Sequence, residues 1–275
     1  MDVPYFADME ETVLAVMAVR NRREKTLCAI ERLLEDRQAP LILVVDDGSR
    51  DDTSQAIAAR YPEVTVLQGD GNLYWGGAMN RGIDVFLTSH HSFLLWLNDD
   101  VELRPNSVDS ALSFAMSREA DIVVGSCTGG DGEVTYGGRI RNAWWKPTSF
   151  PLVCADEKLD TFNGNFVLYR RRVVEALGRI DTDLRQRMGD FDYGLRATAA
   201  GFSLALLPEP VGRCDRNPIE GSILDTHLPR VERFRAMLGI HGMPPRAWWK
   251  FCRRHAGWLA PIAFLKPYMN ILFKR

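Results

Sequence analysis

The stretch LILVVDDGSRDDTSQAIAARYPEVTVLQ, residues 41–68, predicts a strand, a helix and a second strand in succession. Residues 41–47 are apolar and β-branched, residues 51–61 begin with Asp and Thr, which favour helix starts, and residues 64–68 are again β-branched. The same alternation extends outward, with strands predicted at 12–19, 93–98 and 121–127 and helices at 25–36, 76–89 and 107–119. Apolar strands that alternate with helices predict an α/β fold whose mainly parallel, twisted sheet is flanked by helices.

The composition is that of an ordinary globular chain, because 275 residues are 46% hydrophobic and 25% charged. A net charge of −2 provides no field that attracts nucleic acid, so we expect no nucleic-acid partner. The five cysteines are widely spaced without a CxxC pair, which predicts neither a disulfide framework nor a zinc site and favours a reducing cytoplasm. Residues 1–12 lack a basic segment followed by an apolar run, and no apolar stretch reaches about 20 residues, so we expect neither a secretory leader nor a membrane span.

Two predicted strands end in paired carboxylates. VVDDGS supplies Asp46 and Asp47, and FLLWLNDD supplies Asp99 and Asp100. A single Asp after a strand usually caps a turn or a helix. Two acidic pairs at the same edge of a parallel sheet would repel each other, so a divalent cation with oxygen ligands, often one that also binds a substrate's phosphates, is a natural occupant.

The usual glycine-rich phosphate loops are missing from the sequence. No GxxxxGK[ST] occurs, and GDGNLYWGG (69–77) is not GxGxxG and follows the third predicted strand rather than the first. These observations disfavour P-loop enzymes and dehydrogenases. They favour a nucleotide-diphosphate ligand held by carboxylates and a metal.

In the order and spacing of its motifs, the chain resembles the family-2 inverting glycosyltransferases with the GT-A fold, especially bacterial members that build surface polysaccharides, such as O-antigen rhamnosyltransferases. The resemblance covers about residues 12–215 and rests on AVRNRREKTL (18–27), VVDDGSRDDT (44–53), GNLYWGGAMNRGI (71–83), WLNDDVEL (96–103), FNGNFVLYRR (162–171) and GDFDYGLRA (189–197). It implies a catalytic domain at 1–225, divided into a nucleotide-sugar-binding half at 12–127 and an acceptor-binding half at 128–225.

The resemblance also implies roles for individual residues on the donor side. Contacts to the nucleotide sugar are expected from Ala18, Val19, Arg20, Asp46, Asp47, Asn72, Trp75, Gly76, Asn98 and Asp99. Asp46 or Asp47 would accept a hydrogen bond from a pyrimidine N3–H. Asp100 would be the main ligand of Mn²⁺ or Mg²⁺, in a DxD-like motif whose first acid is replaced by Asn98. For Trp75, filling the core between sheet and helix is an equally good interpretation.

On the acceptor side, an inverting transfer needs one carboxylate to take the proton of the acceptor hydroxyl. Asp190 matches the family's base, with Asp192 as an alternate that lies near the acceptor, although the usual Glu before the base is Gly189 here. Helix capping, with Arg196 as an i,i+4 partner of Asp192, is the alternative. Asn163 and Gly164 would lie beneath the acceptor sugar.

Two further points bear on the metal and on the acceptor. Relatives often supply a His ligand from a later loop, whereas VGRCDRNP (211–218) offers Cys214 and Asp215, so no His is assigned to the metal. Residues 226–275 are expected to be a helical appendage in which basic and aromatic residues interleave from 246 onward without an acid. This part fits a membrane interface, packing on the catalytic domain, or contact with a second subunit.

The sequence therefore predicts a metal-dependent inverting glycosyltransferase. The expected donor is a dTDP- or UDP-sugar, with rhamnose as the first choice and another hexose as the alternative. The expected acceptor is a glycan or lipid-linked glycan of the bacterial surface, and the expected location is the cytoplasm, at the inner face of the plasma membrane if the appendage binds lipid. The alternatives are a sugar-nucleotide nucleotidyltransferase, for which RNRREK (20–25) has the charge but not the glycines, and a non-catalytic sugar-binding or scaffold module.

Overall fold

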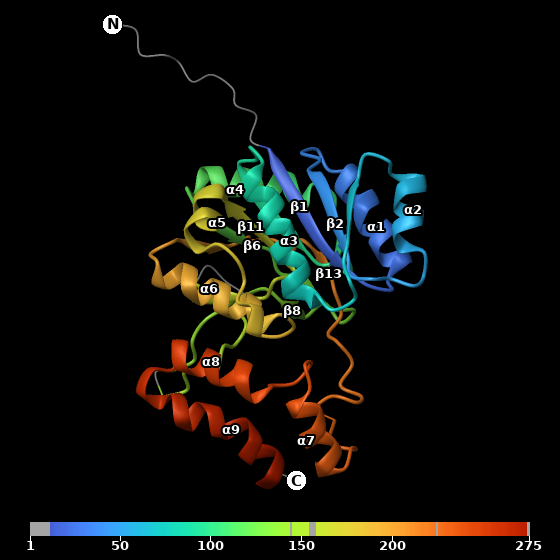
Figure 1. The fold of residues 1–275 in the computed structure, drawn as a ribbon. Coiled ribbons are helices and arrows are strands. Elements are labelled where there is room, and N and C mark those ends of the chain that lie inside the picture. The colour runs from blue at the N-terminus through green and yellow to red at the C-terminus, as the bar shows by residue number, and fades with distance from the viewer. Residues whose placement is uncertain (1–11, 144, 154–157, 224, 274–275) are drawn as a thin grey trace, which may run out of the picture.

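The computed structural model describes residues 12–143, 145–153, 158–223 and 225–273. Within these residues the main sheet has seven strands in the order β12-β6-β11-β4-β1-β2-β3 (Figure 1). The strands are β1 (Val13–Val19), β2 (Leu41–Asp46), β3 (Thr65–Gln68), β4 (Phe93–Leu97), β6 (Ile122–Val124), β11 (Phe166–Arg170) and β12 (Leu204–Leu206). β1 pairs in parallel with β2 and β4, whereas β11 runs antiparallel to β4 and β6. The predicted mainly parallel sheet is confirmed.

Helices cover both faces of this sheet, which explains why its central strands are apolar on both sides. One face packs against α1 (Arg23–Leu34), α2 (Thr53–Arg60) and α4 (Ser107–Ser117). The other packs against α3 (Tyr74–Thr88), α5 (Arg171–Leu177) and α6 (Gly189–Ala199). On this second face Trp96 of β4 contacts Tyr169 and Tyr193 with ring centroids 4.7 and 4.9 Å apart, so the strand and α6 share one aromatic core.

The strand predicted at 121–127 is divided in the structure. Its first part is β6, and its second part, β7 (Cys127–Thr128), joins a separate sheet in the order β5-β13-β7-β8. The chain leaves the main sheet at Gly125, where a Cβ would lie 2.6 Å from a methyl of Val211. The remaining strands are β5 (Glu102–Leu103), β8 (Val134–Tyr136), β13 (Gly212–Arg213) and the pair β9 (Gly138–Arg139) and β10 (Thr161–Phe162).

The C-terminal helices form a layer beside α6 (Figure 1). They are α7 (Arg230–Leu238), α8 (Pro245–His255), the short η2 (Gly257–Leu259) and α9 (Ala260–Phe273). Trp248 and Phe251 of α8 share an apolar cluster with Leu195 of α6 and Leu184 of η1 (Thr182–Leu184), so this helical part packs on the sheet domain. In the part of the chain described here, no helix is both long and apolar enough to cross a bilayer.

Two predictions reach beyond these observations. The domain boundary at residues 225 and 226 stays a prediction. Residues 1–11 and the basic pair at 274–275 lie outside the described residues.

Candidate active site

A cleft of about 590 Å³ opens where the carboxyl ends of β1, β2 and β4 meet the first turns of α3 and α6. Among the described residues it is lined by Ala18, Val19, Arg20, Arg22, Asp47, Tyr74, Trp75, Ala78, Asn98, Asp99, Asp100, Tyr136, Asn163, Gly164, Asn165, Gln186, Met188, Gly189, Asp190, Asn217 and His241. The cleft thus joins segments from the whole length of the chain. Its position matches the rule that ligands bind at the carboxyl edge of an open parallel sheet.

The two carboxylates after β4 share one cation. A guanidinium nitrogen of Arg22 lies 3.0 Å from Oδ1 of Asp99 and 2.8 Å from Oδ2 of Asp100. Asp99 is buried, and Thr26 also donates to it. Burial raises the pKa of Asp99 to about 6, because the positive charge of Arg22 only partly offsets the desolvation and the negative charge of Asp100. Two carboxylates therefore share one guanidinium at this end of β4, so a second cation would balance the remaining negative charge.

The donor atoms at this position fit the divalent metal implied by the fold. Mg²⁺ and Mn²⁺ take oxygen ligands, and Mg²⁺ commonly uses one or two carboxylates plus waters and substrate phosphates. Asp100 and Asp99 can supply those carboxylates. Within the described residues no three His, Cys, Asp or Glu side chains cluster as a complete metal site. The Cys214 thiol lies 3.7 Å from Asp100, and burial first, then the charge of Asp100, raises its pKa to about 12, which disfavours the thiolate form.

The paired acids after β2 mainly hold the backbone. Asp46 is buried outside the cleft, where its carboxylate accepts hydrogen bonds from the Ser49 N–H and the Ser54 hydroxyl. The expected contact between Asp46 and the nucleotide therefore does not match its position. Asp47 does line the cleft, and its two oxygens accept from three N–H groups, those of Gly71 (2.8 Å), Leu73 (3.1 Å) and Tyr74 (2.9 Å). Asp47 thereby fixes the start of α3 against the end of β2.

In the segment from 71 to 77, the cleft is lined by Tyr74 and Trp75. Of these two, Trp75 is the residue that the sequence singled out. Its indole N–H donates to Oδ1 of Asn98 at 3.0 Å, and its ring packs edge-on against Trp96 at 5.4 Å. Trp75 therefore lines the cleft and also packs on the core, and its contact with a nucleotide sugar stays a prediction. Asn72 is exposed outside the cleft, with its amide 3.5 Å from the Asp70 carbonyl. Gly76 is buried where a Cβ would lie 2.8 Å from the Arg185 backbone, so it permits close packing rather than contacting the cleft.

Asp190 lies at the start of α6 and lines the cleft. Its carboxylate accepts from the backbone N–H of Gly164 at 3.1 Å and of Phe191 at 2.8 Å. Desolvation raises the pKa of Asp190, an effect that these two donors and the nearby Arg139 oppose. The site therefore holds an oriented, half-buried carboxylate whose basicity is increased.

The glycine before this carboxylate has a structural cause. A Cβ at Gly189 would lie 2.7 Å from the Leu184 carbonyl oxygen, so the position has no room for the Glu expected from the family. Gly164 is equally confined, because a Cβ there would lie 2.8 Å from the Trp75 ring and 3.3 Å from Cβ of Asp190.

Asp192 does not line the cleft, so its position does not support the expected contact with the acceptor. Its side chain is fully buried and forms an ion pair with Arg254 of α8. Oxygen Oδ1 accepts from Arg254 at 2.5 Å and lies 2.8 Å from Nε2 of His255, and Oδ2 accepts from Arg196 at 3.0 Å. These cationic and hydrogen-bonding partners lower the pKa of Asp192 against the opposing effect of burial. The alternative of an i,i+4 pair with Arg196 is the one observed.

Several cleft residues were not singled out from the sequence. Arg22 could have been recognised from the basic run that follows the first strand. Arg139, which does not line the cleft but donates to Oδ1 of the lining residue Asn163 at 2.8 Å, lies on the two-residue strand β9, which carries no motif. His241 lines the cleft from the loop between α7 and α8, a region that was predicted only as an appendage. No local sequence pattern predicts this contact.

Known proteins with similar sequences include glycosyltransferases. Residues 14–178 match the model of glycosyl transferase family 2. An N-acetylglucosaminyl-diphospho-decaprenol L-rhamnosyltransferase of Mycobacterium tuberculosis is 26% identical over 195 residues, which are 61% of this chain and 64% of that protein. A polyprenol monophosphomannose synthase of Mycolicibacterium smegmatis is 25% identical over 209 residues, 72% of this chain and 76% of that protein. The chain thus spans less than two thirds of the rhamnosyltransferase that it matches.

Solved structures share the fold at lower identity. A mannosyltransferase from Pyrobaculum calidifontis, determined with GDP-Man and Mn²⁺, superimposes with a TM-score of 0.57 at 16% identity and covers 95% of this chain and 70% of its own. TarS of S. aureus, residues 1–349, superimposes with a TM-score of 0.55 at 15% identity, covering 96% of this chain and 73% of its own.

Proposed function

Because the chain belongs to glycosyl transferase family 2 and has the GT-A fold, we propose that it is an inverting transferase that uses a nucleotide-diphosphate sugar. The observation that carries this proposal is the position of Asp190, an oriented carboxylate that faces the same cleft as Asp99 and Asp100. A base on one side and a site for diphosphate charge on the other are the two parts that such a transfer needs.

On the donor side, the nucleotide would lie against the end of β1 at Ala18–Arg20 and beside Asp47. The Arg22 guanidinium is placed to exchange part of its contact with the carboxylates for oxygens of the diphosphate. Asp100, with Asp99, would hold Mn²⁺ or Mg²⁺, which when bound neutralises charge on the leaving diphosphate. A pyrimidine nucleotide, dTDP or UDP, is the proposed carrier.

On the acceptor side, Asp190 would take the proton of the attacking hydroxyl. The hydroxyl oxygen forms a bond to the anomeric carbon as the bond from that carbon to the diphosphate oxygen breaks, and the electron pair leaves with the nucleoside diphosphate. Attack from the face opposite the leaving group inverts the configuration. The backbone N–H groups of Gly164 and Phe191 hold the Asp190 carboxylate in place, and its raised pKa makes it a stronger base.

We propose rhamnose as the sugar and a lipid-linked glycan of a bacterial surface polysaccharide as the acceptor. Support comes from the relatives, one of which is a rhamnosyltransferase that acts on a decaprenol-linked diphosphate according to its name. Asn163, which is held by Arg139, lines the same cleft as Asp190 and suits an acceptor that carries hydroxyls.

The test is nucleoside-diphosphate release from a panel of UDP-, dTDP- and GDP-sugars, with and without Mn²⁺ or Mg²⁺, in the presence of prenyl-diphosphate-linked acceptors. Asp190→Asn should lower transfer by about 10² to 10⁴-fold while donor binding, followed by thermal shift, persists. Glu63→Gln, the same change at an exposed residue outside the cleft, should leave transfer unchanged. If Asp190→Asn retains full activity, the assignment of the base is wrong; if no donor binds or reacts, a non-catalytic module is the better interpretation.

A further inference from the structure

The C-terminal helices carry an exposed apolar face that the active site does not use. Ile262, Leu265, Met269 and Leu272 repeat along α9 at spacings of three and four residues, so they lie on one side of the helix. These four side chains are 44% to 64% exposed. A groove of about 470 Å³ continues this side onto α8 and is lined by Pro245, Arg246, Trp249, Pro261, Phe264 and Leu265. We call this surface, with Ile262, Met269 and Leu272, the α8–α9 face.

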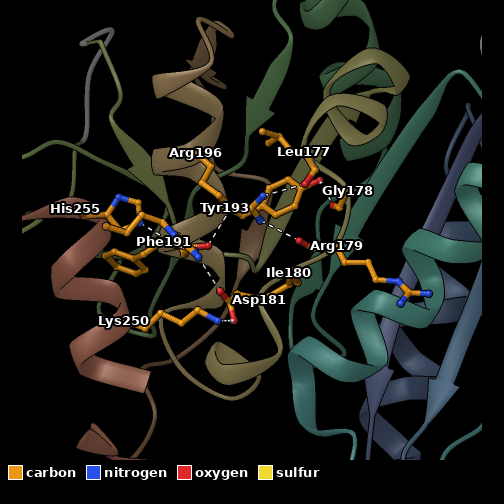
Figure 2. Close-up of polar contacts among 12 residues, drawn as sticks. Leu177, Gly178, Arg179, Ile180, Asp181, Phe191, Tyr193, Arg196, Lys250 and His255 are labelled. Carbon is orange, nitrogen blue, oxygen red and sulfur yellow. Dashed lines mark hydrogen bonds and ion pairs between the residues drawn. The ribbon is translucent and has the colours of Figure 1, made fainter. Parts of the chain in front are cut away.

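This face is separate from the side by which the same helices are held on the protein. Trp248, Phe251 and Cys252 of α8 are buried in the cluster shared with α6. Lys250 of α8 binds Asp181 at 2.7 Å (Figure 2). Arg254 of the same helix binds Asp181 at 2.8 Å. Because apolar packing and ion pairs hold the opposite side of these helices on the protein, the α8–α9 face has a fixed position.

Basic side chains surround the apolar surface. Residues 233–275 contain nine Lys and Arg residues and no Asp or Glu. Arg246 lies in the groove, and Arg253 and Lys266 are exposed on the same two helices. Apolar and aromatic side chains bordered by cations are the composition of helices that lie in the interface of an anionic bilayer.

We infer that the α8–α9 face docks on the surface of an anionic lipid bilayer, with Trp249 and the apolar side chains of α9 entering the interfacial region. A second copy of this chain is a poorer occupant. In a twofold dimer the same patch meets itself, so Arg253 and Lys266 would approach the partner's cations with no acid in this segment to balance them. Anionic headgroups provide the missing complementary charge.

Docking in this way would also orient the cleft. His241, which lines the cleft, lies only four residues before Pro245, which lines the groove. The loop between α7 and α8 thus connects the two surfaces directly, and a bilayer beneath α8 and α9 would lie beside the acceptor side of the cleft. Bilayer binding itself requires no sugar donor, so it can succeed or fail independently of the proposed transfer.

The experiment is co-sedimentation of the full chain with vesicles of phosphatidylcholine alone and with about one third phosphatidylglycerol. The wild-type protein should bind the anionic vesicles, and Ile262→Glu with Leu265→Glu should weaken binding by at least about tenfold, because two exposed apolar contacts become charged. Arg253→Glu with Lys266→Glu should weaken binding to anionic vesicles only. Leu41→Glu, at an exposed leucine that begins β2, is the matched control and should bind as wild type.

Two further measurements distinguish a bilayer from a second copy of the chain as the partner of the α8–α9 face. Brominated lipids should quench the tryptophan fluorescence of the wild-type protein if Trp249 enters the bilayer. The inference is overturned if the wild-type chain stays in the supernatant, or if the Ile262→Glu, Leu265→Glu variant binds as tightly as wild type. It is also overturned if light scattering shows a dimer that this variant dissociates while vesicles are not bound, since a second copy would then cover the face.

Discussion

Replacing Asp192 by Asn should destabilise the protein without touching the chemistry of the cleft. The side chain has 0% exposure and balances Arg254 and Arg196, with His255 also in hydrogen-bonding distance. The amide keeps the shape and one acceptor oxygen but loses the negative charge. Two partly buried guanidinium groups would then share a site without their counter-ion.

The expected loss follows from this geometry. Breaking a buried ion pair by removing one partner costs about 3 to 5 kcal/mol, because the remaining charge stays desolvated. The lower end applies here, since Arg254 keeps its 2.8 Å contact with Asp181 and the Arg254 side chain is 33% exposed. We therefore expect a loss of about 3 kcal/mol in the free energy of unfolding, a large part of the 5 to 15 kcal/mol typical of a domain.

Urea unfolding followed by fluorescence measures this loss. With an m-value of about 3 kcal/mol/M, the midpoint should fall by about 1 M. Glu175→Gln, which removes the exposed 3.4 Å pair with Arg171, should change the free energy by less than about 0.5 kcal/mol. A loss below about 1 kcal/mol for Asp192→Asn would refute the reasoning. A raised KM for the acceptor at unchanged stability would instead restore Asp192 to the acceptor site.

Four further outcomes are expected. Ion pairs with Lys250 and Arg254 lower the pKa of Asp181 to about 2. The contribution of Asp181 to stability is therefore complete above about pH 4 and is lost as the pH falls toward 2. Asp181→Asn should flatten this acid dependence of the free energy of unfolding, measured in urea titrations at pH 5 and pH 3. The rate of transfer should rise as the pH increases through the raised pKa of Asp190, because only the carboxylate can accept a proton. A plot of kcat against pH should show this rise. Gly164→Ala should lower kcat by tenfold or more, because the added Cβ would lie 2.8 Å from Trp75 and a small misplacement of reacting groups has a cost of this order. Single-turnover kinetics would detect this loss, and an unchanged kcat would count against tight packing at Gly164. Arg22→Gln should raise the KM for the donor by roughly ten- to 100-fold, which corresponds to the free energy of about one charge-assisted hydrogen bond. Unchanged donor kinetics would show that Arg22 does not bind the diphosphate.

The fold was predictable because the pattern that specifies it is local and repeated. Apolar runs at 41–46 and 93–97 are long enough to identify strands, and amphipathic segments between them identify helices. What the pattern did not predict is the break at Gly125, because the Val211 side chain that forbids a Cβ there comes from a distant segment. The antiparallel direction of β11 is likewise a consequence of tertiary pairing with β4 and β6.

The candidate site was predictable in its acids and less so in their partners. Asp47 and Asp99 were expected at strand ends, and both line the cleft. Asp46, the neighbour of Asp47, lies outside the cleft because its carboxylate accepts hydrogen bonds from the Ser49 N–H and the Ser54 hydroxyl, which the sequence places nearby but does not orient. His241 could not be found at all, since its contact depends on how the C-terminal helices pack on α6.

The geometry of a helix decides between the two acids of GDFDYGLRA. Residues two apart on an α-helix point about 200° apart, because each residue turns the chain by about 100°. Asp190 and Asp192 both lie in the first turn of α6, so one helix face can carry only one of them to the cleft. The Trp75 ring and the Gly164 N–H meet the side of Asp190, whereas α8 with Arg254 meets the side of Asp192. The second acid therefore anchors the C-terminal helices to the same helical turn that presents the proposed base.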